Sequence, residues 1–325
     1  MTGLIIAVGG LAGMVLISYL VEALRRAPTP PERLGWAPEI PIRSITVDGV
    51  RLRYITTGDG PPLVLLHTLR TQLDMFQHVV PQLARRFRVY ALDYPGHGYS
   101  DIPKATYSAE YFVGVVAAFL DQLEIRNALV VGESIGGTIA LVLAARKHPG
   151  VARVLAVNPY DYDVGRGLRR ASPIANLFFG PNDVPVVGGT MERLRLFPIA
   201  RPVFQGGVHR RSALSPAFVR ELYRVGNRPG HYQAFMSLVH QWPSWEQVRA
   251  EYDKIAVPVL LLYGDHDWSR PAERDADARG IPGAQMRVAP NAGHFLSLDA
   301  PDEILRAVAD LSTAGSTLGP VTTGR

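Results

Sequence analysis

The sequence predicts an α/β fold built on a mostly parallel, doubly wound sheet. Short apolar runs without polar alternation recur along the chain, which is typical of strands buried on both faces. Longer helical stretches separate these runs, and this strand–helix alternation favours a parallel sheet. Of the 325 residues, 47% are hydrophobic and 19% are charged, so the chain can bury a large core.

An apolar segment precedes the alternating pattern. Residues 3–21 carry no charge and are long enough to cross a bilayer, which needs roughly 20 residues. No Lys or Arg precedes the run and no polar face interrupts it. We therefore expect an uncleaved, single-pass transmembrane anchor over residues 1–26 that contacts membrane lipid through residues 3–21. A cleaved signal peptide is the alternative. Positive residues follow the run, so the domain after it is expected in the cytoplasm.

The rest of the chain divides by composition. Residues 27–41 are Pro-rich and predict a stiff linker. Residues 160–250 break the strand–helix rhythm, so we expect a cap there, inserted between core segments 42–159 and 251–311. The small polar tail, residues 312–325, is predicted to be disordered. Strands are expected at 42–47, 50–56, 63–67, 89–92, 128–132, 154–157, 259–263 and 286–289, and core helices at 73–86, 109–123, 136–147 and 301–311.

A serine motif lies between a predicted strand and a predicted helix. Gly132, Ser134 and Gly136 form Gly-x-Ser-x-Gly, the pattern of a nucleophile elbow in this context. The turn is strained and crowded, so glycines are needed two residues to either side of the serine. The backbone N–H of Ile135, at the start of the helix, is placed to bind a developing oxyanion.

Three further segments make the pattern specific. They are DYPGHGYS at 93–100, GDHD at 264–267 and NAGHF at 291–295. With them, residues 42–311 resemble the α/β-hydrolase superfamily, in a form that carries a cap. The resemblance implies a chain order of serine, acid and histidine. It therefore predicts a catalytic triad of Ser134, Asp267 and His294, in which the histidine is the base and the acid orients it.

Alternatives to this triad come from the same resemblance. Some members of the superfamily carry the acid after the sixth strand, where this chain has Asp161 and Asp163. Haloalkane dehalogenases and epoxide hydrolases of the fold use an aspartate as nucleophile, and Ser134 argues against both.

The same comparison places the remaining site residues. It assigns the second oxyanion donor to the N–H of Leu69, although Thr68 replaces the usual glycine beside it. Arg70 is a candidate substrate contact because its positive charge can be directed toward the site. Tyr160 and Trp242 are candidates because aromatic side chains suit a pocket for an apolar acyl or aromatic group. An anchor in the membrane would place this pocket near lipid, which favours an amphiphilic substrate.

These residues predict a serine hydrolase, esterase- or lipase-like, that acts on a carboxylic ester through an acyl-enzyme. C–C bond hydrolysis, perhydrolysis or acyl transfer with the same triad are alternatives, and a non-catalytic ligand-binding protein is the alternative from another class. The chain has no cysteine, and no metal or cofactor motif is found, so neither is expected. The net charge of +5 comes from scattered Arg residues, and no nucleic-acid partner is expected. Nothing in the sequence predicts an oligomeric state.

Overall fold

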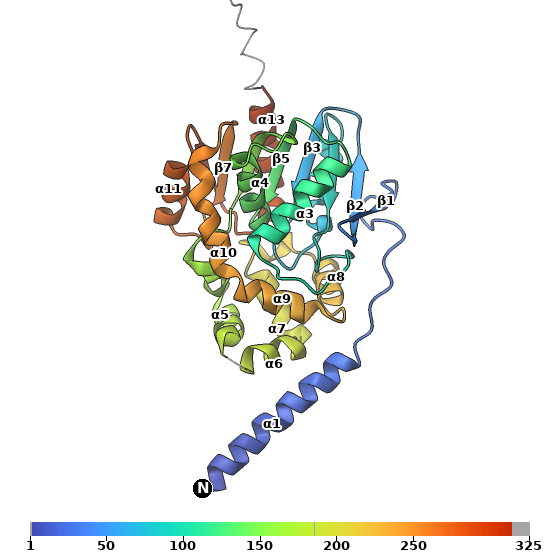
Figure 1. Ribbon diagram of the computed structural model, residues 1–325, viewed down its shortest axis with the longest axis vertical. Coiled ribbons are helices and arrows are strands. Elements are labelled where there is room, and N and C mark those ends of the chain that lie inside the picture. Colours follow the sequence, from blue (N-terminus) through green and yellow to red (C-terminus); the bar gives the residue numbers. More distant parts are fainter. Residues whose placement is uncertain (1, 185, 314–325) are drawn as a thin grey trace, which may run out of the picture.

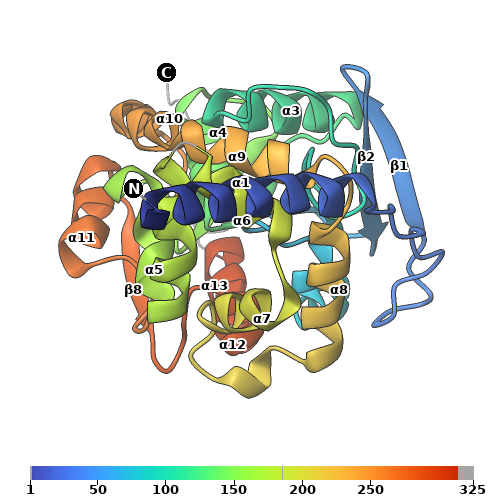
Figure 2. The same ribbon diagram turned by 90° about the horizontal axis from the view of Figure 1, so that it is seen from below.

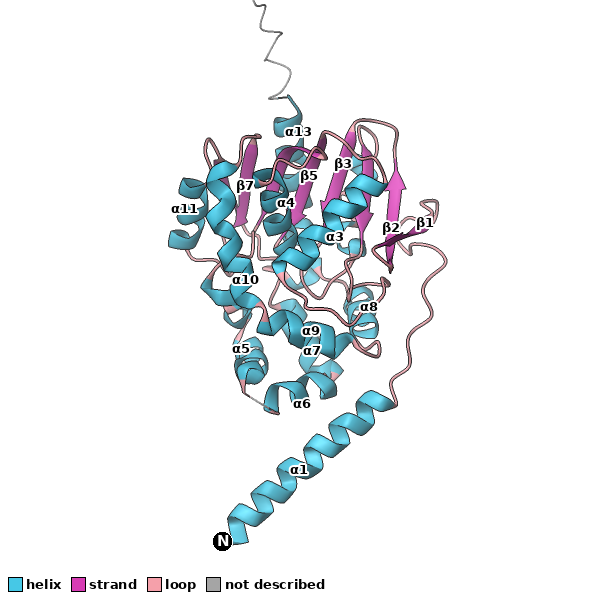
Figure 3. Cartoon of the chain, viewed as in Figure 1, coloured by secondary structure: helices cyan, strands magenta, loops and turns pink. Residues whose placement is uncertain are grey.

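The computed structural model describes residues 2–184 and 186–313, with the side chains of residues 2–8 and 183 left out. Its centre is an eight-stranded sheet in the order β1-β2-β4-β3-β5-β6-β7-β8 (Figure 1 and Figure 3). Strand β2 is antiparallel to β1 and β4, and the other pairs are parallel. The strands are β1 Ile42–Val47, β2 Val50–Thr57, β3 Pro62–Leu66, β4 Arg88–Leu92, β5 Ala128–Glu133, β6 Val151–Val157, β7 Val259–Gly264 and β8 Gln285–Ala289.

Helices cover both faces of this sheet, as a doubly wound fold requires. One apolar cluster joins α3 and α4 to side chains such as Val64 and Val130, and a second joins α2 and α13 to the neighbouring Leu65 and Val131. Alternate residues of one strand thus feed opposite layers. The core helices are α2 Val80–Leu83, α3 Ala109–Gln122, α4 Ile135–Ala145, α11 Pro271–Gly280, α12 Leu296–Asp299 and α13 Pro301–Thr313.

Every predicted strand overlaps an observed one, but the predicted helix at 73–86 is wrong. The segment forms a 3-10 helix, η1 (Leu73–Phe76), and the short α2 instead. Pro81 lies in the first turn of α2, and it has no N–H with which to continue a helix from η1. The N–H of Leu73 donates to a carboxylate oxygen of Asp93, 2.8 Å away, which fixes the start of η1 to the sheet edge.

The segment between β6 and β7 forms a helical layer over the carboxyl ends of the parallel strands (Figure 1). It contains the residues 160–250 that the sequence predicts as a cap, and we use that name for it. Its helices are α5 Pro173–Phe179, α6 Val187–Leu194, α7 Phe197–Gln205, α8 Pro216–Gly226, α9 His231–His240 and α10 Trp242–Gln247.

Helix α1, Thr2–Ala23, lies across the outer side of the cap beside α6 (Figure 1 and Figure 2). Arg193 of α6 donates to the hydroxyl of Ser18, which is buried, over 2.9 Å. Arg195 lies 2.9 Å from a carboxylate oxygen of Glu22. In the part of the chain that the structure describes, no helix meets the length and apolarity of a membrane span. The predicted transmembrane anchor over residues 3–21 is therefore not supported, and polar contacts fix the end of this helix to the cap.

The predicted linker before the domain and the predicted tail after it are both partly ordered against or within the domain. The predicted linker at 27–41 buries Leu34, Ala37 and Ile40 in the cluster beneath α2 and α13, so it packs on the core. Helix α13 continues to Thr313, two residues into the predicted tail. Residues 314–325, the rest of that tail, lie outside the described residues.

Candidate active site

The turn between β5 and α4 holds Ser134 in a strained conformation. Its φ is 60° and its ψ is −122°, values that a residue with a side chain rarely adopts. A Cβ atom on Gly132 would lie 2.0 Å from the carbonyl oxygen of Gly136, and one on Gly136 would lie 2.2 Å from the carbonyl oxygen of Leu66. Strand and helix therefore approach so closely that both flanking positions require glycine.

The three residues of the predicted triad meet at the carboxyl edge of the sheet. The hydroxyl of Ser134 lies 2.8 Å from Nε2 of His294, and Nδ1 of His294 lies 2.5 Å from Oδ1 of Asp267. Asp267 follows β7 and His294 follows β8, so neighbouring parallel strands deliver both to one edge. Burial by itself raises the pKa of Asp267, but the charge and hydrogen bond of His294 together with two hydrogen bonds from Ser269 hold it below its usual value.

The alternative acids after β6 point elsewhere. Asp161 accepts a hydrogen bond of 2.5 Å from the hydroxyl of Tyr252, and Asp163 accepts one of 2.5 Å from Arg170. Neither carboxylate has a contact with His294 among the described residues. The geometry therefore favours Asp267 as the partner of the imidazole.

The backbone N–H groups of Leu69 and Ile135, the two predicted oxyanion donors, lie in turns beside Ser134. Leu69 lines the same cavity as Ser134, and Ile135 is the first residue of α4. Within the described parts of the chain, neither backbone N–H donates a hydrogen bond. The turn that carries Leu69 is closed by Thr71, whose hydroxyl donates to the carbonyl of Thr68 over 2.8 Å. Thr68 therefore replaces the usual glycine in a turn that the side chain of Thr71 stabilises.

A small cavity of about 40 Å³ lies over Ser134. Of the predicted substrate contacts, Arg70 and Tyr160 line it, but Trp242 does not. Most of the lining is apolar: Leu69, Leu168, Ala171, Phe179, Val203, Phe204, Phe235, Trp268 and Phe295.

Arg70 is held by the cap. Its guanidinium donates to the buried Glu192 of α6 over 2.9 Å and lies 4.1 Å above the ring of Phe235. The ion pair and the cation–π contact fix this charge at the rim of the cavity.

Buried polar neighbours of the site have structural roles. His67 accepts a hydrogen bond of 3.2 Å from the N–H of Tyr94, and burial lowers its pKa to about 3. Glu133, next to the elbow serine, accepts a hydrogen bond of 3.3 Å from the N–H of Ser297, and burial raises its pKa to about 8. No group of His, Asp and Glu in the described residues is arranged to hold a metal ion.

Sequence reasoning missed two residues that follow Asp267 directly. Ser269 donates to the Asp267 carboxylate from both its N–H and its hydroxyl. Trp268 packs against His294 and lines the cavity. The only sequence signal for either residue is its place in the loop beside the acid.

Comparison with known proteins agrees with this architecture. Residues 61–301 match the family described as the alpha/beta hydrolase fold. An uncharacterised protein of Mycobacterium tuberculosis is 27% identical over 277 residues, which cover 81% of this chain and 78% of the relative. The enol-lactonase of Burkholderia xenovorans LB400 is 25% identical with a TM-score of 0.67, over 83% of this chain and 100% of that chain.

A membrane phospholipase A, described as a bacterial virulence factor, shares the fold over more of the chain. It covers 97% of this chain and 98% of its own, with 22% identity and a TM-score of 0.71. The family match spans most of the described chain and the sheet has the corresponding order, so this protein belongs to the alpha/beta hydrolase fold family.

Proposed function

We propose that this protein is a serine hydrolase that cleaves a carboxylic ester through an acyl-enzyme. The observation that carries the proposal is the position of His294, which lies within hydrogen-bond distance of both Ser134 and Asp267. A serine hydroxyl is a weak nucleophile unless a base removes its proton, and an imidazole oriented by a carboxylate is such a base. The apolar cavity over Ser134 adds support, because it suits an acyl group.

The geometry supports a two-step reaction. Oγ of Ser134 attacks the ester carbonyl carbon while Nε2 of His294 takes the hydroxyl proton, and the N–H groups of Leu69 and Ile135 donate to the oxyanion. When the intermediate collapses, His294 returns the proton to the departing alcohol, which leaves the acyl group on Ser134. A water molecule then gives a proton to His294 and attacks the acyl carbon. When this second intermediate collapses, His294 returns the proton to Oγ of Ser134, which breaks the bond to the acyl group and releases the carboxylic acid. Asp267 keeps the imidazole in the required orientation throughout.

The enol-lactonase is consistent with an ester substrate. A lactone is a cyclic ester, and the enol-lactonase shares 25% of its sequence with this chain. The substrate of the enol-lactonase is a property of that enzyme. For this protein we propose only the same class of reaction, ester hydrolysis.

Labelling with a fluorophosphonate probe tests the nucleophile. We expect the wild-type protein to be labelled and Ser134→Ala to take no label. Ser312→Ala, a serine near the end of α13, serves as the matched control and should label as the wild type does. Equal labelling of Ser134→Ala, or no labelling of the folded wild type, would refute the proposal.

A panel of substrates tests the reaction. We expect turnover of 4-nitrophenyl esters, with no need for a second substrate. Turnover of a vinylogous diketone with none of the esters would favour C–C hydrolysis instead. A requirement for hydrogen peroxide or for an acceptor alcohol would favour perhydrolysis or acyl transfer.

We also propose that the protein associates with a lipid surface. Helix α1 lies on the outside of the cap (Figure 2), and it exposes Leu16 by 71% and Leu20 by 60%, while Leu24, directly after the helix, is exposed by 70%. Exposed apolar side chains on one helix are typical of interfacial binding.

Co-sedimentation with phosphatidylcholine–phosphatidylglycerol vesicles tests this proposal. The wild type should sediment with the vesicles, and the double variant Leu16→Asp/Leu20→Asp should remain in the supernatant. Equal sedimentation of this variant and the wild type would argue against it.

A further inference from the structure

The turn that carries Leu69, one of the predicted oxyanion donors, is strained at its centre. It spans Thr68 to Thr71, and the N–H of Thr71 donates to the carbonyl of Thr68 over 3.4 Å. Arg70, the third residue, has a φ of 58°, a left-handed value that turns usually give to glycine or asparagine. A residue with a side chain keeps such a φ only where its surroundings hold it. Contacts of Arg70 are therefore needed to maintain the turn.

The backbone of the turn is held at its ends and not at its centre. Thr68 and Thr71 are buried, and the N–H of Thr68 donates to the sulfur of Met75 over 3.4 Å. In the described parts of the chain, the N–H and C=O groups of Leu69 and Arg70 pair with no other backbone group. The conformation of these two residues thus depends on contacts of their side chains.

The cap supplies such a contact to the side chain of Arg70. The guanidinium donates to Oε2 of Glu192 in α6 over 2.9 Å, and it lies 4.1 Å from the centre of the Phe235 ring in α9. The side chain of Glu192 is fully buried, and that of Arg70 is 15% exposed. Two helices of the cap therefore hold the residue that directly follows Leu69.

The carboxylate of Glu192 is committed to this contact. Its Oε2 accepts from Arg70, and its Oε1 has no hydrogen-bond partner among the described residues. Arg195 donates to the backbone carbonyl of Glu192 over 2.7 Å and not to the carboxylate. A buried carboxylate destabilises a fold unless a counter-charge pairs with it, so this pairing strongly favours the observed position of Arg70.

We infer that Glu192 is a positioning residue of the proposed reaction, and that its ion pair with Arg70 holds the strained turn so that the N–H of Leu69 faces the oxyanion formed at Ser134. Glu192 acts through Arg70 and does not contact the substrate. A donor stabilises the oxyanion fully only if it is in place before the charge develops. This inference rests on the proposed esterase function and adds to it a contribution of the cap to the oxyanion hole.

Glu192→Gln removes the charge with little change in size. We expect kcat for 4-nitrophenyl butyrate to fall about 10- to 100-fold, because the N–H of Leu69 is displaced but still present. KM should stay within about threefold of the wild type, since the oxyanion exists only after Ser134 has attacked. Glu221→Gln is the matched control. Glu221, in α8 of the cap, accepts a hydrogen bond of 2.5 Å from Tyr99 of the core instead of one from the turn, so kcat should change by less than about threefold.

A trifluoromethyl ketone gives a second readout of the oxyanion hole. Oγ of Ser134 adds to its carbonyl carbon, the hydroxyl proton passes to Nε2 of His294, and the carbonyl oxygen becomes an oxyanion. We expect the inhibition constant of butyl trifluoromethyl ketone to rise in Glu192→Gln by about the factor by which kcat/KM falls. A role of Glu192 in folding alone would lower the unfolding temperature and leave both constants unchanged, and this result would overturn the inference.

Double variants test whether the ion pair maintains the strained backbone. Arg70→Ala/Glu192→Leu and Arg70→Gly/Glu192→Leu lack the pair equally, but glycine adopts a φ of 58° without strain and alanine does not. We expect kcat of the glycine variant to exceed that of the alanine variant by at least about fivefold. Equal values would refute the inference. These variants leave no unpaired buried charge, so they decide the question even if Glu192→Gln does not fold.

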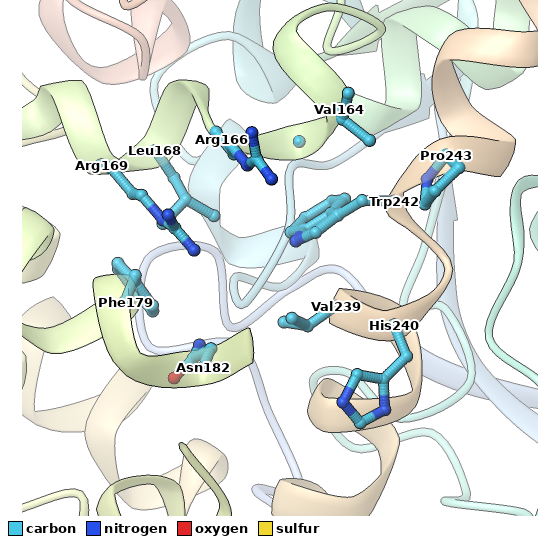
Figure 4. Close-up of a pocket in the computed structure, with 11 residues that line it drawn as sticks. Val164, Arg166, Leu168, Arg169, Phe179, Asn182, Val239, His240, Trp242 and Pro243 are labelled. Carbon is cyan, nitrogen blue, oxygen red and sulfur yellow. The ribbon is translucent and has the colours of Figure 1, made fainter. Parts of the chain in front are cut away.

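Arg166→Gln controls for the loss of a positive charge near the site. Arg166 lines another cavity of the cap, of about 270 Å³ (Figure 4), and its replacement should change kcat by less than about threefold. Arg70→Gln should lower kcat as Glu192→Gln does. Arg70→Lys keeps a charge that can pair with Glu192, so it should lose less. A similar loss in Arg166→Gln and Arg70→Gln would mean that charge alone, and not the turn, accounts for the effect.

Amide hydrogen exchange separates the turn from the chemistry. The N–H of Thr71 closes the turn, so its exchange should be at least about tenfold faster in Glu192→Gln than in the wild type and in Glu221→Gln. Equal exchange in the three proteins would overturn the inference. If exchange is faster but the wild type hydrolyses no ester and takes no fluorophosphonate label, the esterase proposal fails while the hold of Glu192 on the turn is confirmed.

Discussion

The indole of Trp268 lies flat against the imidazole of His294. The ring centroids are 3.8 Å apart and the planes differ by 10°. The indole nitrogen also donates a hydrogen bond of 3.0 Å to the carbonyl oxygen of Gly206, in the cap. Trp268 therefore connects the proposed base to the cap, and its stacked ring restricts the rotation of the imidazole.

Replacing this indole should slow the chemical step. We expect Trp268→Leu to lower kcat for 4-nitrophenyl acetate by about tenfold, because a stacked ring holds the base within hydrogen-bond distance of both partners. Trp268→Phe keeps an aromatic face and should lose less. Steady-state kinetics measure both, and thermal unfolding shows that each variant is folded. An unchanged kcat in Trp268→Leu would mean that the stacking has no orienting role.

Removing the charge of the proposed acid should have a larger effect. We expect Asp267→Asn to lower kcat by about 10⁴-fold, because the amide no longer holds the imidazole in the required tautomer. Asp163→Asn is the matched control, since Asp163 pairs with Arg170 and not with His294. It should keep kcat within about threefold of the wild type. The reverse pattern would move the acid to the position after β6.

The sequence predicts the sheet and the proximity of Ser134, Asp267 and His294. Short apolar runs and the spacing of glycines are local patterns, and each is compatible with only a few structures. It does not predict the contacts of Trp268 or the ion pair of Arg70 with Glu192, since both depend on how the cap folds over the sheet. The error at residues 3–21 has the same origin. Hydropathy is calculated from the apolar run alone. The contacts of its end with Arg193 and Arg195 involve residues that lie far away in the sequence, so they appear only in the folded chain.

The elbow should not tolerate a methyl group. Gly132→Ala places a Cβ atom 2.0 Å from the carbonyl oxygen of Gly136, so we expect at least about 3 kcal/mol of destabilisation or no soluble protein. Gly114→Ala is the control, because a Cβ atom there, in the interior of α3, meets nothing within 4 Å. It should stabilise the protein by up to about 1 kcal/mol. Urea unfolding measures both, and a well-folded Gly132→Ala would show that the turn can relax.

Glu133 should make stability depend on pH. Burial raises the pKa of this carboxyl from 4.5 to about 8, so the folded state favours the neutral form. Its contribution to stability is complete below pH 4.5 and is lost as the pH rises through about 8. Glu133→Gln stays neutral, so its free energy of unfolding relative to the wild type should rise between pH 5 and pH 9, by on the order of a few kcal/mol.

Urea unfolding at several pH values measures this difference. Glu124→Gln, at an exposed glutamate in the loop after α3, should follow the wild-type pH profile. Parallel profiles for Glu133→Gln and the wild type would mean that the buried carboxyl does not titrate in this range.

One of the contacts between α1 and the cap is made by a carboxylate. Glu22 accepts a hydrogen bond of 3.0 Å from Arg25 and lies 2.9 Å from Arg195, whose pKa is lowered to about 10 by burial. Glu22→Gln removes the counter-charge of a buried guanidinium, and the least costly response is for α1 to leave the cap and let water reach Arg195. We expect amide hydrogen exchange in residues 9–23 to become about 10- to 100-fold faster, with little change in the core strands.

Glu32→Gln, in the exposed part of the following segment, is the control and should leave this exchange unchanged. Equal protection of α1 in Glu22→Gln and the wild type would show that the other contacts, such as that of Arg193 with Ser18, hold the helix on the cap.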